Sequence, residues 1–286
     1  MLFNQNSCFF YVNNSKNQNM QISHPCFSEA SHYSVFRIHL PVALKCNIKC
    51  KYCDRKIGAS YHASRPGVTK QIISPADALK LVDDLLKEKK YPEVVIGIAG
   101  PGEALYNEET FQTLELINSK YPNTQLCICT NGLLLNRYAQ KLYDLGVKYL
   151  TVTINAISPL IGKNIYSWII YEEKVYRGIE GVKILIENQI AGLKASAKLG
   201  MMIKVNSVLV PGINDFHLPE ISKAIKEAGA YIHNIMPLIP LAELSHIQPP
   251  SCDLLRDSRN QCEKIFPQFR LCKQCRADAC SIPGLE

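Results

Sequence analysis

Several features that assign a protein to a class at first sight are missing from this sequence. No segment approaches the roughly 18 consecutive apolar residues that a membrane-spanning helix needs. Residues 1–20 contain no basic start followed by an apolar core, so they lack the pattern of a secretory signal. No known nucleic-acid-binding motif accompanies the basic residues, which are scattered along the chain. We therefore expect a cytoplasmic protein that binds neither a membrane nor nucleic acid.

Cysteine, in contrast, is abundant. The chain of 286 residues contains 12 cysteines. A disulfide framework is not expected of them, because the cytosol keeps thiols reduced, and in a chain of this size they indicate metal or redox chemistry. The formal net charge of +7 fits a negatively charged partner, such as an anionic metal cluster or an acidic carrier protein, and it also fits simple solubility.

The spacing of apolar residues predicts an α/β fold. From residue 37 onwards, short β-branched segments alternate with longer segments whose apolar residues recur every three or four positions. Strands joined by helices pair in parallel, with right-handed crossovers. Because only six strands can be counted, we predict an open partial (β/α)6 barrel, similar to part of a TIM barrel. The expected strands are 37–44, 94–100, 126–130, 149–155, 201–210 and 231–238, and the expected helices are 75–89, 108–119, 136–145, 178–199 and 217–227.

This pattern divides the chain into three parts. Residues 1–23, which are rich in Asn and Ser, are expected to form a loosely ordered N-terminal arm. Residues 24–240 would contain the barrel. Residues 241–286 would form an irregular, cysteine-containing extension that belongs to the same domain and caps the mouth of the barrel.

The strongest chemical signal is a Cys-x3-Cys-x2-Cys motif directly after the first predicted strand, formed by Cys46, Cys50 and Cys53. Three thiolates on one loop can bind three irons of a 4Fe–4S cube and leave the fourth iron open to another ligand. A zinc site would usually need a fourth ligand nearby, and His62 is the only candidate. Tyr52, which precedes the third cysteine, could stack on a planar base.

This motif, at the end of the first of six strands, resembles that of the radical S-adenosylmethionine (SAM) superfamily. The resemblance implies that the three cysteines hold a catalytic 4Fe–4S cluster and that SAM binds to it. The turn formed by Gly100, Pro101, Gly102 and Glu103 would meet the methionine amino group, since glycines let carbonyls approach an ammonium and a carboxylate neutralises it. Without the resemblance it would be read as a tight turn. The residues expected to meet the ribose and adenine, unless they are ordinary strand-end residues, are Thr153, Asn155 and Ile165.

A second set of metal-binding residue types is dispersed along the chain. Taken alone, a Cys-x2-Cys pair could be half of a zinc site or a redox pair. On a parallel third strand, Cys127 would point into the barrel near the same mouth. The second set consists of His24, Cys26, Cys127, Cys272 and Cys275.

Longer motifs resemble the NifB family of nitrogenase cofactor maturases, in the same order along almost the whole chain. The resemblance implies a radical enzyme that binds two 4Fe–4S substrate clusters beside the catalytic one. It would fuse them into an eight-iron, nine-sulfur precursor around a carbide, after SAM has supplied a methyl group and a second SAM the 5′-deoxyadenosyl radical that removes hydrogen from it. The matching segments are 24–32, 37–56, 64–68, 97–105, 130–133, 151–155, 204–217, 233–239 and 272–279.

The same resemblance implies roles for particular residues and partners. The second set would hold the two substrate clusters, with no ligand assigned to one cluster or the other. Arg37 and His39 match a pair on the first strand, which is either catalytic or a structural polar pair. The implied partners are a low-potential electron donor of the ferredoxin or flavodoxin type, an iron–sulfur cluster donor and an acceptor of the cofactor precursor.

One loop departs from the family pattern. Ala59 stands where the family has a further cysteine, and Ala63 stands where it has a glutamate. Two cubes with three ligands each need six protein ligands, and only five are matched. Two residues could supply the sixth, His62 in the same loop or Cys129, which shares a strand face with Cys127, and the inserted residue in the loop favours His62 slightly. The alternatives are a paralogue that cleaves SAM without making carbide, or a non-catalytic iron–sulfur carrier.

Overall fold

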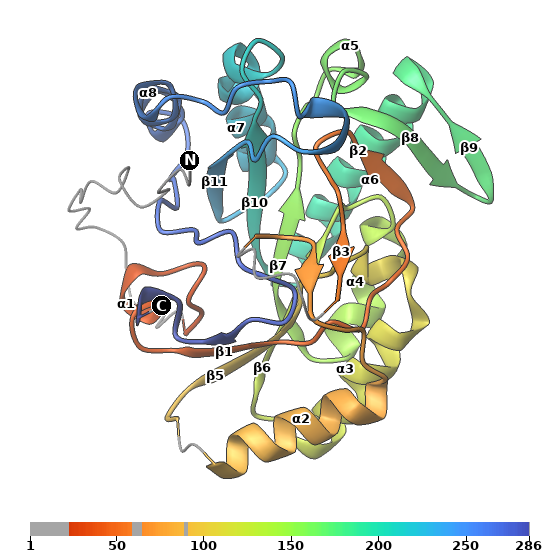
Figure 1. The fold of residues 1–286 in the computed structure, drawn as a ribbon, viewed down its shortest axis with the longest axis vertical. Coiled ribbons are helices and arrows are strands. Elements are labelled where there is room, and N and C mark those ends of the chain that lie inside the picture. Colours follow the sequence, from red (N-terminus) through yellow and green to blue (C-terminus); the bar gives the residue numbers. More distant parts are fainter. Residues whose placement is uncertain (1–22, 59–64, 89–90, 286) are drawn as a thin grey trace.

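A curved sheet of parallel strands forms the centre of the protein. The computed structural model describes residues 23–58, 65–88 and 91–285 (Figure 1). Six parallel strands lie side by side in the order in which they occur along the chain. This arrangement confirms the predicted open partial barrel. The strands are Phe36–His39 (β1), Val94–Ile98 (β5), Gln125–Thr130 (β6), Val147–Thr153 (β7), Met202–Leu209 (β10) and Ile232–Pro237 (β11).

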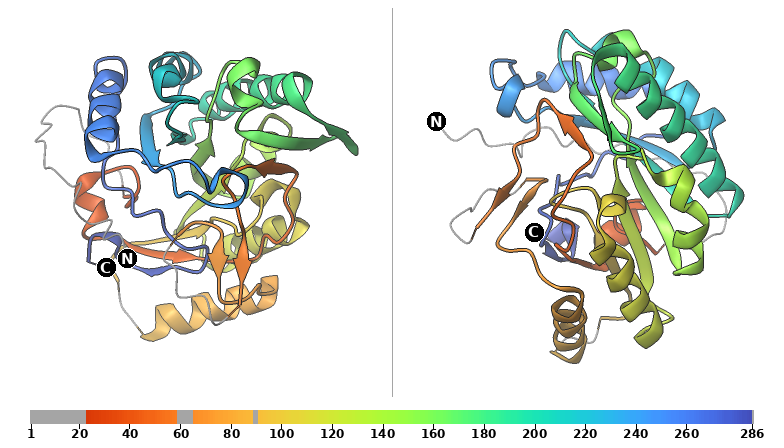
Figure 2. Two further views of the ribbon diagram at one scale, coloured as in Figure 1. Left: turned by 45° about the horizontal axis from the view of Figure 1, so that its top comes forward. Right: turned by 90° about the vertical axis from the view of Figure 1, so that its right-hand side faces the viewer.

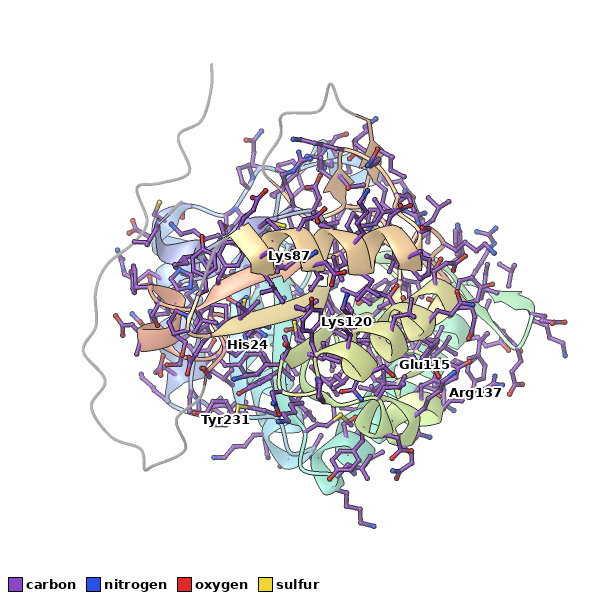
Figure 3. All side chains as sticks on the ribbon, turned by 90° about the horizontal axis from the view of Figure 1, so that it is seen from below. His24, Lys87, Glu115, Lys120, Arg137 and Tyr231 are labelled. Carbon is purple, nitrogen blue, oxygen red and sulfur yellow. The ribbon has the colours of Figure 1, made fainter. Side chains whose placement is uncertain are left out.

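Helices cover the outer face of this sheet (Figure 2). Alternate strand residues such as Ile38, Ile96 and Ile128 are fully buried against them in the main hydrophobic core. Charged residues such as Lys87, Glu115 and Arg137 lie on these helices, as seen from below in Figure 3. The helices are Pro75–Glu88 (α2), Glu108–Lys120 (α3), Leu135–Asp144 (α4), Gly178–Lys198 (α6) and Leu218–Glu227 (α7).

Three parts of the structure differ from the sequence-based expectation. The first strand ends at His39 instead of residue 44, because Pro41 has no N–H to contribute to a sheet. The C-terminal extension is more regular than expected, since it contains the helix Cys252–Glu263 (α8) and the strand Cys280–Ser281 (β12), which pairs antiparallel with β1.

The loop expected after β7 also contains regular structure. A hairpin of Tyr166–Tyr171 (β8) and Lys174–Tyr176 (β9) follows the short helix Pro159–Gly162 (α5). Ile48–Cys50 (β2) pairs antiparallel with β8, so the loop that carries the cysteine motif is bound to this hairpin. The remaining short elements are Glu29–His32 (α1), Lys56–Ile57 (β3), Val68–Thr69 (β4), Ala104–Tyr106 (η2), Asp215–His217 (η3), Ala242–Leu244 (η4) and Pro283–Leu285 (η5).

The inner face of the sheet differs in composition from the outer face. Side chains at alternate strand positions point into the barrel, and there they include thiols, an imidazole and an ammonium instead of aliphatic groups. Strand register places Cys129, Thr151 and Lys204 in one row across β6, β7 and β10. The adjacent row, across β1, β5, β6 and β7, consists of His39, Gly97, Cys127 and Tyr149.

Within the described ranges, no helix is both long and apolar enough to cross a membrane.

Asn214 joins the ends of β7 and β10. Its Nδ2 donates to the carbonyls of Asn155 and Val208, both at 2.9 Å, and its Oδ1 accepts from Val210 N. Because Asn214→Ala leaves these buried groups unpaired, we expect it to lower the free energy of unfolding by about 2–4 kcal/mol. The control Asn188→Ala removes a single hydrogen bond on α6 and should cost less than about 0.5 kcal/mol. Chemical denaturation of the metal-free protein measures both, and equal costs would contradict the prediction.

Candidate active site

The cysteine motif lies on the loop that follows β1. Cys53 N donates to the carbonyl of Cys50 at 3.0 Å, and Lys49 Nζ donates to the carbonyl of Cys53 at 2.7 Å. These bonds close a turn that brings the three cysteines of the motif into electrostatic contact, Cys50 interacting with both Cys46 and Cys53. All three are half-buried. We call this the triplet loop.

Burial controls the protonation of the triplet. It raises the pKa of the Cys46 thiol to about 11 and raises the pKa values of Cys50 and Cys53 as well. Negative charge on the neighbouring thiolates raises the pKa of Cys50 further. The three crowded, buried thiols are therefore protonated in the metal-free protein, and a metal must displace their protons to bind.

The donor set fits an iron–sulfur cube better than a single ion. In the described part of the chain, no group of three or more His, Cys, Asp or Glu side chains is arranged to hold one metal ion. A cube does not require that arrangement, since each thiolate binds a different iron. Cys46, Cys50 and Cys53 would hold such a cluster.

The triplet loop is fixed to the turn that ends β5. Gly102 N donates to the carbonyl of Ala43 at 2.7 Å, and Glu103 N donates to that of Lys45 at 2.8 Å. A Cβ at position 102 would overlap the carbonyl oxygens of Leu44 and Lys45, so only glycine allows the two backbones to approach this closely. The predicted methionine-binding turn is therefore also the support of the triplet loop.

Asn107, which the sequence analysis did not single out, completes this connection. Its Oδ1 accepts from Lys45 N at 2.9 Å, while its Nδ2 donates to the carbonyls of Lys45 and Glu103 at 2.9 and 2.7 Å. The side chain is buried and precedes α3. An Asn at the start of a helix is commonly a cap, so the position of Asn107 in the sequence did not indicate that its side chain connects the triplet loop to the end of β5.

The carboxylate of Glu103, predicted to meet an amino group, is engaged by hydrogen bonds from within the protein. It accepts hydrogen bonds from Leu105 N, Thr130 Oγ1 and Asn131 N, and joins the ends of β5 and β6. Burial raises the pKa of this carboxyl, against the effect of the three donors. Since three internal donors engage the carboxylate, the backbone of the turn, including Gly100 and Gly102, is the better candidate for contact with an amino group.

Two of the three residues predicted to meet the ribose and adenine, Asn155 and Ile165, lie beside Tyr52. Asn155 Nδ2 donates to the hydroxyls of Tyr52 at 2.8 Å and Tyr166 at 3.1 Å, and its Oδ1 accepts from Val208 N. Ile165 is fully buried, in an apolar cluster against which Cys46, Cys50 and Tyr52 pack. Thr153 is half-buried at the end of β7. Contact of these residues with a base or ribose stays a prediction.

The second set of predicted ligands also converges, on the inner face of the sheet. The buried Cys127 interacts electrostatically with Cys129 and Cys26, and Cys129 interacts with Cys26 and Cys272. Burial raises the pKa of Cys127 well above its ordinary value and that of Cys129 to about 11. Segments from both ends of the described chain thus bring thiols to strand β6.

His24, labelled in Figure 3, lies on the segment before β1 and packs on Tyr149, the register neighbour of Cys127. Its ring is buried and packs on Phe27 and Tyr149, with centroid separations of 4.8 and 4.6 Å. Its Nδ1 accepts from Cys26 N at 3.0 Å, and its Nε2 has no hydrogen-bond partner among the described residues. Burial lowers its pKa, which keeps the imidazole neutral, as a metal ligand must be.

Arg37 and His39 connect the first strand to the C-terminal extension. Arg37 Nη1 donates to Cys275 Sγ at 2.6 Å, and Arg37 Nη2 donates to Ser281 Oγ. His39 Nδ1 lies 2.9 Å from the carbonyl of Arg276. Burial, followed by the charge of Arg37, lowers the pKa of His39 to about 3, so this ring is neutral at physiological pH.

Gly97 leaves room for the side chains of His39 and Cys127, and a cavity lies next to His39. A Cβ at position 97 would lie 2.5 Å from Cys127 Sγ and 3.4 Å from His39 Cδ2, so glycine is required between them. On the side of the C-terminal extension, His39 and Cys275 line a cavity of about 490 Å³ with Arg276 and Cys280.

The two candidates for a sixth ligand differ in what the structure says of them. His62, like Ala59 and Ala63, lies outside the described residues. Cys129 lies within the second set, and its thiol is hydrogen-bonded to the side chain of Thr151.

Comparisons with known proteins identify the family of this chain. Residues 40–225 match the radical SAM superfamily. The FeMo cofactor biosynthesis protein NifB of Methanocaldococcus jannaschii is 52% identical over 260 residues, which cover 91% of this chain and 86% of that protein. The chain belongs to the NifB family. The predicted resemblance is therefore confirmed.

Other NifB relatives match over a similar share of this chain. That of Methanocaldococcus infernus is 46% identical over 271 residues, covering 94% of this chain and 88% of that protein. That of Chlorobaculum tepidum is 42% identical over 266 residues, but the match covers only 62% of its length. Some members of the NifB family are thus considerably longer than this chain.

Two solved structures share the fold. A radical SAM methyltransferase from Sphaerobacter thermophilus aligns with a TM-score of 0.54 and 15% identity, over 82% of this chain and 64% of that chain. Streptococcus suis SuiB aligns with a TM-score of 0.56 and 13% identity, over 82% of this chain and 47% of that chain. At such identities they show that this NifB family member has the radical SAM barrel, and nothing about its substrate.

Asn107→Asp tests the support of the triplet loop. The carboxylate keeps an acceptor for Lys45 N but opposes the carbonyls of Lys45 and Glu103 with no hydrogens to donate. We expect the cluster of the triplet to be lost to a chelator roughly tenfold faster. Measurement in the Cys272→Ala/Cys275→Ala background reports this cluster most directly. The exposed Asn136→Asp serves as the control, and identical rates in the two variants would refute the prediction.

Proposed function

We propose that this protein is a radical SAM enzyme of nitrogenase cofactor biosynthesis. It would fuse two 4Fe–4S substrate clusters into an eight-iron precursor with a carbide derived from SAM. The observation that supports this proposal most is the presence of two separate sulfur-rich groups in one barrel, the triplet loop and the second set. The NifB relatives carry the corresponding name, which includes cofactor biosynthesis.

The triplet loop would hold the catalytic 4Fe–4S cluster, which when bound supplies an electron to SAM. Gly102 and Asn107 fix the loop to the end of β5. Tyr52 packs beside the triplet against the apolar cluster that contains the buried Ile165, in surroundings of the kind that exclude water from a nucleoside. The hydrogen bond of Asn155 holds the Tyr52 ring in one orientation.

The substrate clusters would be held by the second set, which consists of His24, Cys26, Cys127, Cys272 and Cys275. Both ends of the described chain contribute to it, so the clusters would be enclosed between the sheet and its coverings. Arg37 adds positive charge and a hydrogen bond at Cys275. His39 lines the cavity and stays neutral, so it adds no positive charge beside Arg37.

Cys129 is a better supported sixth ligand than the His62 that the sequence favoured. Its electrostatic partners, Cys26 and Cys272, belong to the second set. It occupies the strand row next to that of Cys127, on the same face of β6. We propose that the thiol of Cys129 replaces the cysteine that the family resemblance led us to expect at Ala59.

The nucleoside-binding residues favour an enzyme over a simple iron–sulfur carrier, because a carrier has no use for a Tyr52–Asn155 arrangement next to its cluster. Reduction would require a low-potential electron donor of the ferredoxin or flavodoxin type. Cluster supply and precursor removal would require a donor and an acceptor protein. A paralogue that cleaves SAM without making carbide is the remaining alternative.

The two sulfur groups should separate by mutation. We expect Cys272→Ala/Cys275→Ala to lose iron yet keep slow, uncoupled formation of 5′-deoxyadenosine, because the triplet loop is intact. Cys46→Ala/Cys50→Ala/Cys53→Ala should form none. Anaerobic reconstitution followed by iron analysis and chromatography of 5′-deoxyadenosine and S-adenosylhomocysteine measures both. Undiminished 5′-deoxyadenosine in the triple variant would end the radical-enzyme proposal, and zinc at an unaltered iron content would reverse the assignment of the C-terminal pair.

Iron content also decides between the two candidate sixth ligands. Cys129→Ser conserves shape but removes the thiolate, so we expect fewer irons per chain after reconstitution. His62→Ala should leave the iron content unchanged. The opposite result would restore His62. If neither change lowers the iron content, the chain holds fewer clusters than proposed and the paralogue without carbide synthesis becomes the better description.

A further inference from the structure

Lys204 is a buried lysine on β10 that no step of the proposed function uses. Its side chain is 3% exposed. Strand register places it beside Thr151, which in turn lies beside Cys129. The ammonium is 5.2 Å from the centre of the Phe269 ring and 5.6 Å from that of Phe27. Lys204 therefore reaches the inner face of the barrel between two aromatic rings.

Cysteine thiolates would raise the pKa of Lys204 against the effect of burial, whereas a protonated thiol supplies no negative charge. The favourable electrostatic interactions of Lys204 are with Cys26, Cys272, Cys129 and Cys275, in that order. No carboxylate within the described residues forms an ion pair with it. Four cysteines from three separate parts of the chain surround one ammonium.

Such a lysine is unfavourable in the protein without metal and favourable with an anion. A buried charge without a counter-charge is costly, and contacts with two aromatic faces offset only part of that cost. A thiolate-ligated iron–sulfur cluster carries net negative charge and presents sulfur atoms as hydrogen-bond acceptors. A cluster bound among these cysteines would supply the counter-charge that the polypeptide does not.

We propose that Lys204, which lies near Cys26, Cys129, Cys272 and Cys275, is a positioning residue for the substrate clusters bound by the second set. Its ammonium neutralises a bound cluster and donates hydrogen bonds to its sulfur atoms. Arg37, on β1, adds a second positive charge, and its Nη1 donates to Cys275 Sγ. This inference rests on the proposed function, since it requires that these cysteines bind a cluster.

The alternative is a purely structural lysine whose stem packs between Phe27 and Phe269. The two roles differ in what they predict for the metal-free protein. If Lys204 serves packing alone, methionine, of similar length, conserves that packing and changes no property of a cluster. If it serves the cluster, Lys204→Met relieves the metal-free protein of a lone buried charge and weakens cluster binding.

The experiment uses the Cys46→Ala/Cys50→Ala/Cys53→Ala chain as parent, so that bound iron reports the second set only. Lys204→Met, Lys204→Arg and the exposed control Lys198→Met are introduced into it and reconstituted anaerobically. The readouts are the rate of iron loss to a chelator, the reduction potential by electron paramagnetic resonance, and the free energy of unfolding without metal.

Lys204→Met should lose iron roughly ten- to a hundredfold faster than the parent, the range expected when a hydrogen bond to a charged group is removed. Its reduction potential should move to more negative values, since a positive charge near the cluster is gone, while its metal-free stability is equal to or above that of the parent. Lys204→Arg should retain the parent's potential, and Lys198→Met should behave as the parent.

An unchanged potential and iron-loss rate in Lys204→Met would overturn the inference. So would a metal-free Lys204→Met that is less stable than the parent, because this outcome would show that the ammonium already stabilises the protein without a cluster. If the parent itself binds no iron, the proposed substrate-cluster site fails first, and the role of Lys204 fails with it. That outcome is read before any Lys204 variant is compared.

Discussion

The alternation of side chains along a parallel sheet constrains most of this structure. Residues such as Ile96 and Ile128 face outwards and are covered by the α-helices that connect the strands. The residues between them face inwards, where the connecting helices cannot reach. Something else must cover that face, and in this protein the segment before β1 and the extension after β11 do so. Both segments carry cysteines, so the inner face is covered and supplied with thiols by the same residues.

The triplet loop depends on a different kind of contact. Its position is fixed mainly by backbone hydrogen bonds, at Ala43, Lys45 and Ile165, together with the Asn107 side chain, which bonds to both Lys45 and Glu103. Backbone contacts leave the side chains of the loop available for metal. They also explain why Gly102 is required, because any side chain there would push the loop away from its support.

The six parallel strands could be predicted because each is a short apolar run between helical patterns. Both sulfur groups could be predicted because cysteine spacing and family motifs can be read directly from the sequence. Sequence reasoning did not find β8, β9 and β12. These strands are partly exposed; β8 pairs with both β9 and the triplet loop, and β12 pairs with β1. Asn107 and Lys204 were missed for a related reason. Their significance lies in what the fold brings next to them, and neither residue type nor neighbours in sequence reveal it.

The bond between Arg37 and Cys275 joins residues separated by 238 positions. The triplet, by contrast, is complete within one short loop near the start of the barrel. The three cysteines of the triplet need only one local turn to come together. The thiols of the second set come together only when the segment before β1 and the extension after β11 have both packed on the sheet, so the two sulfur groups depend on different stages of folding.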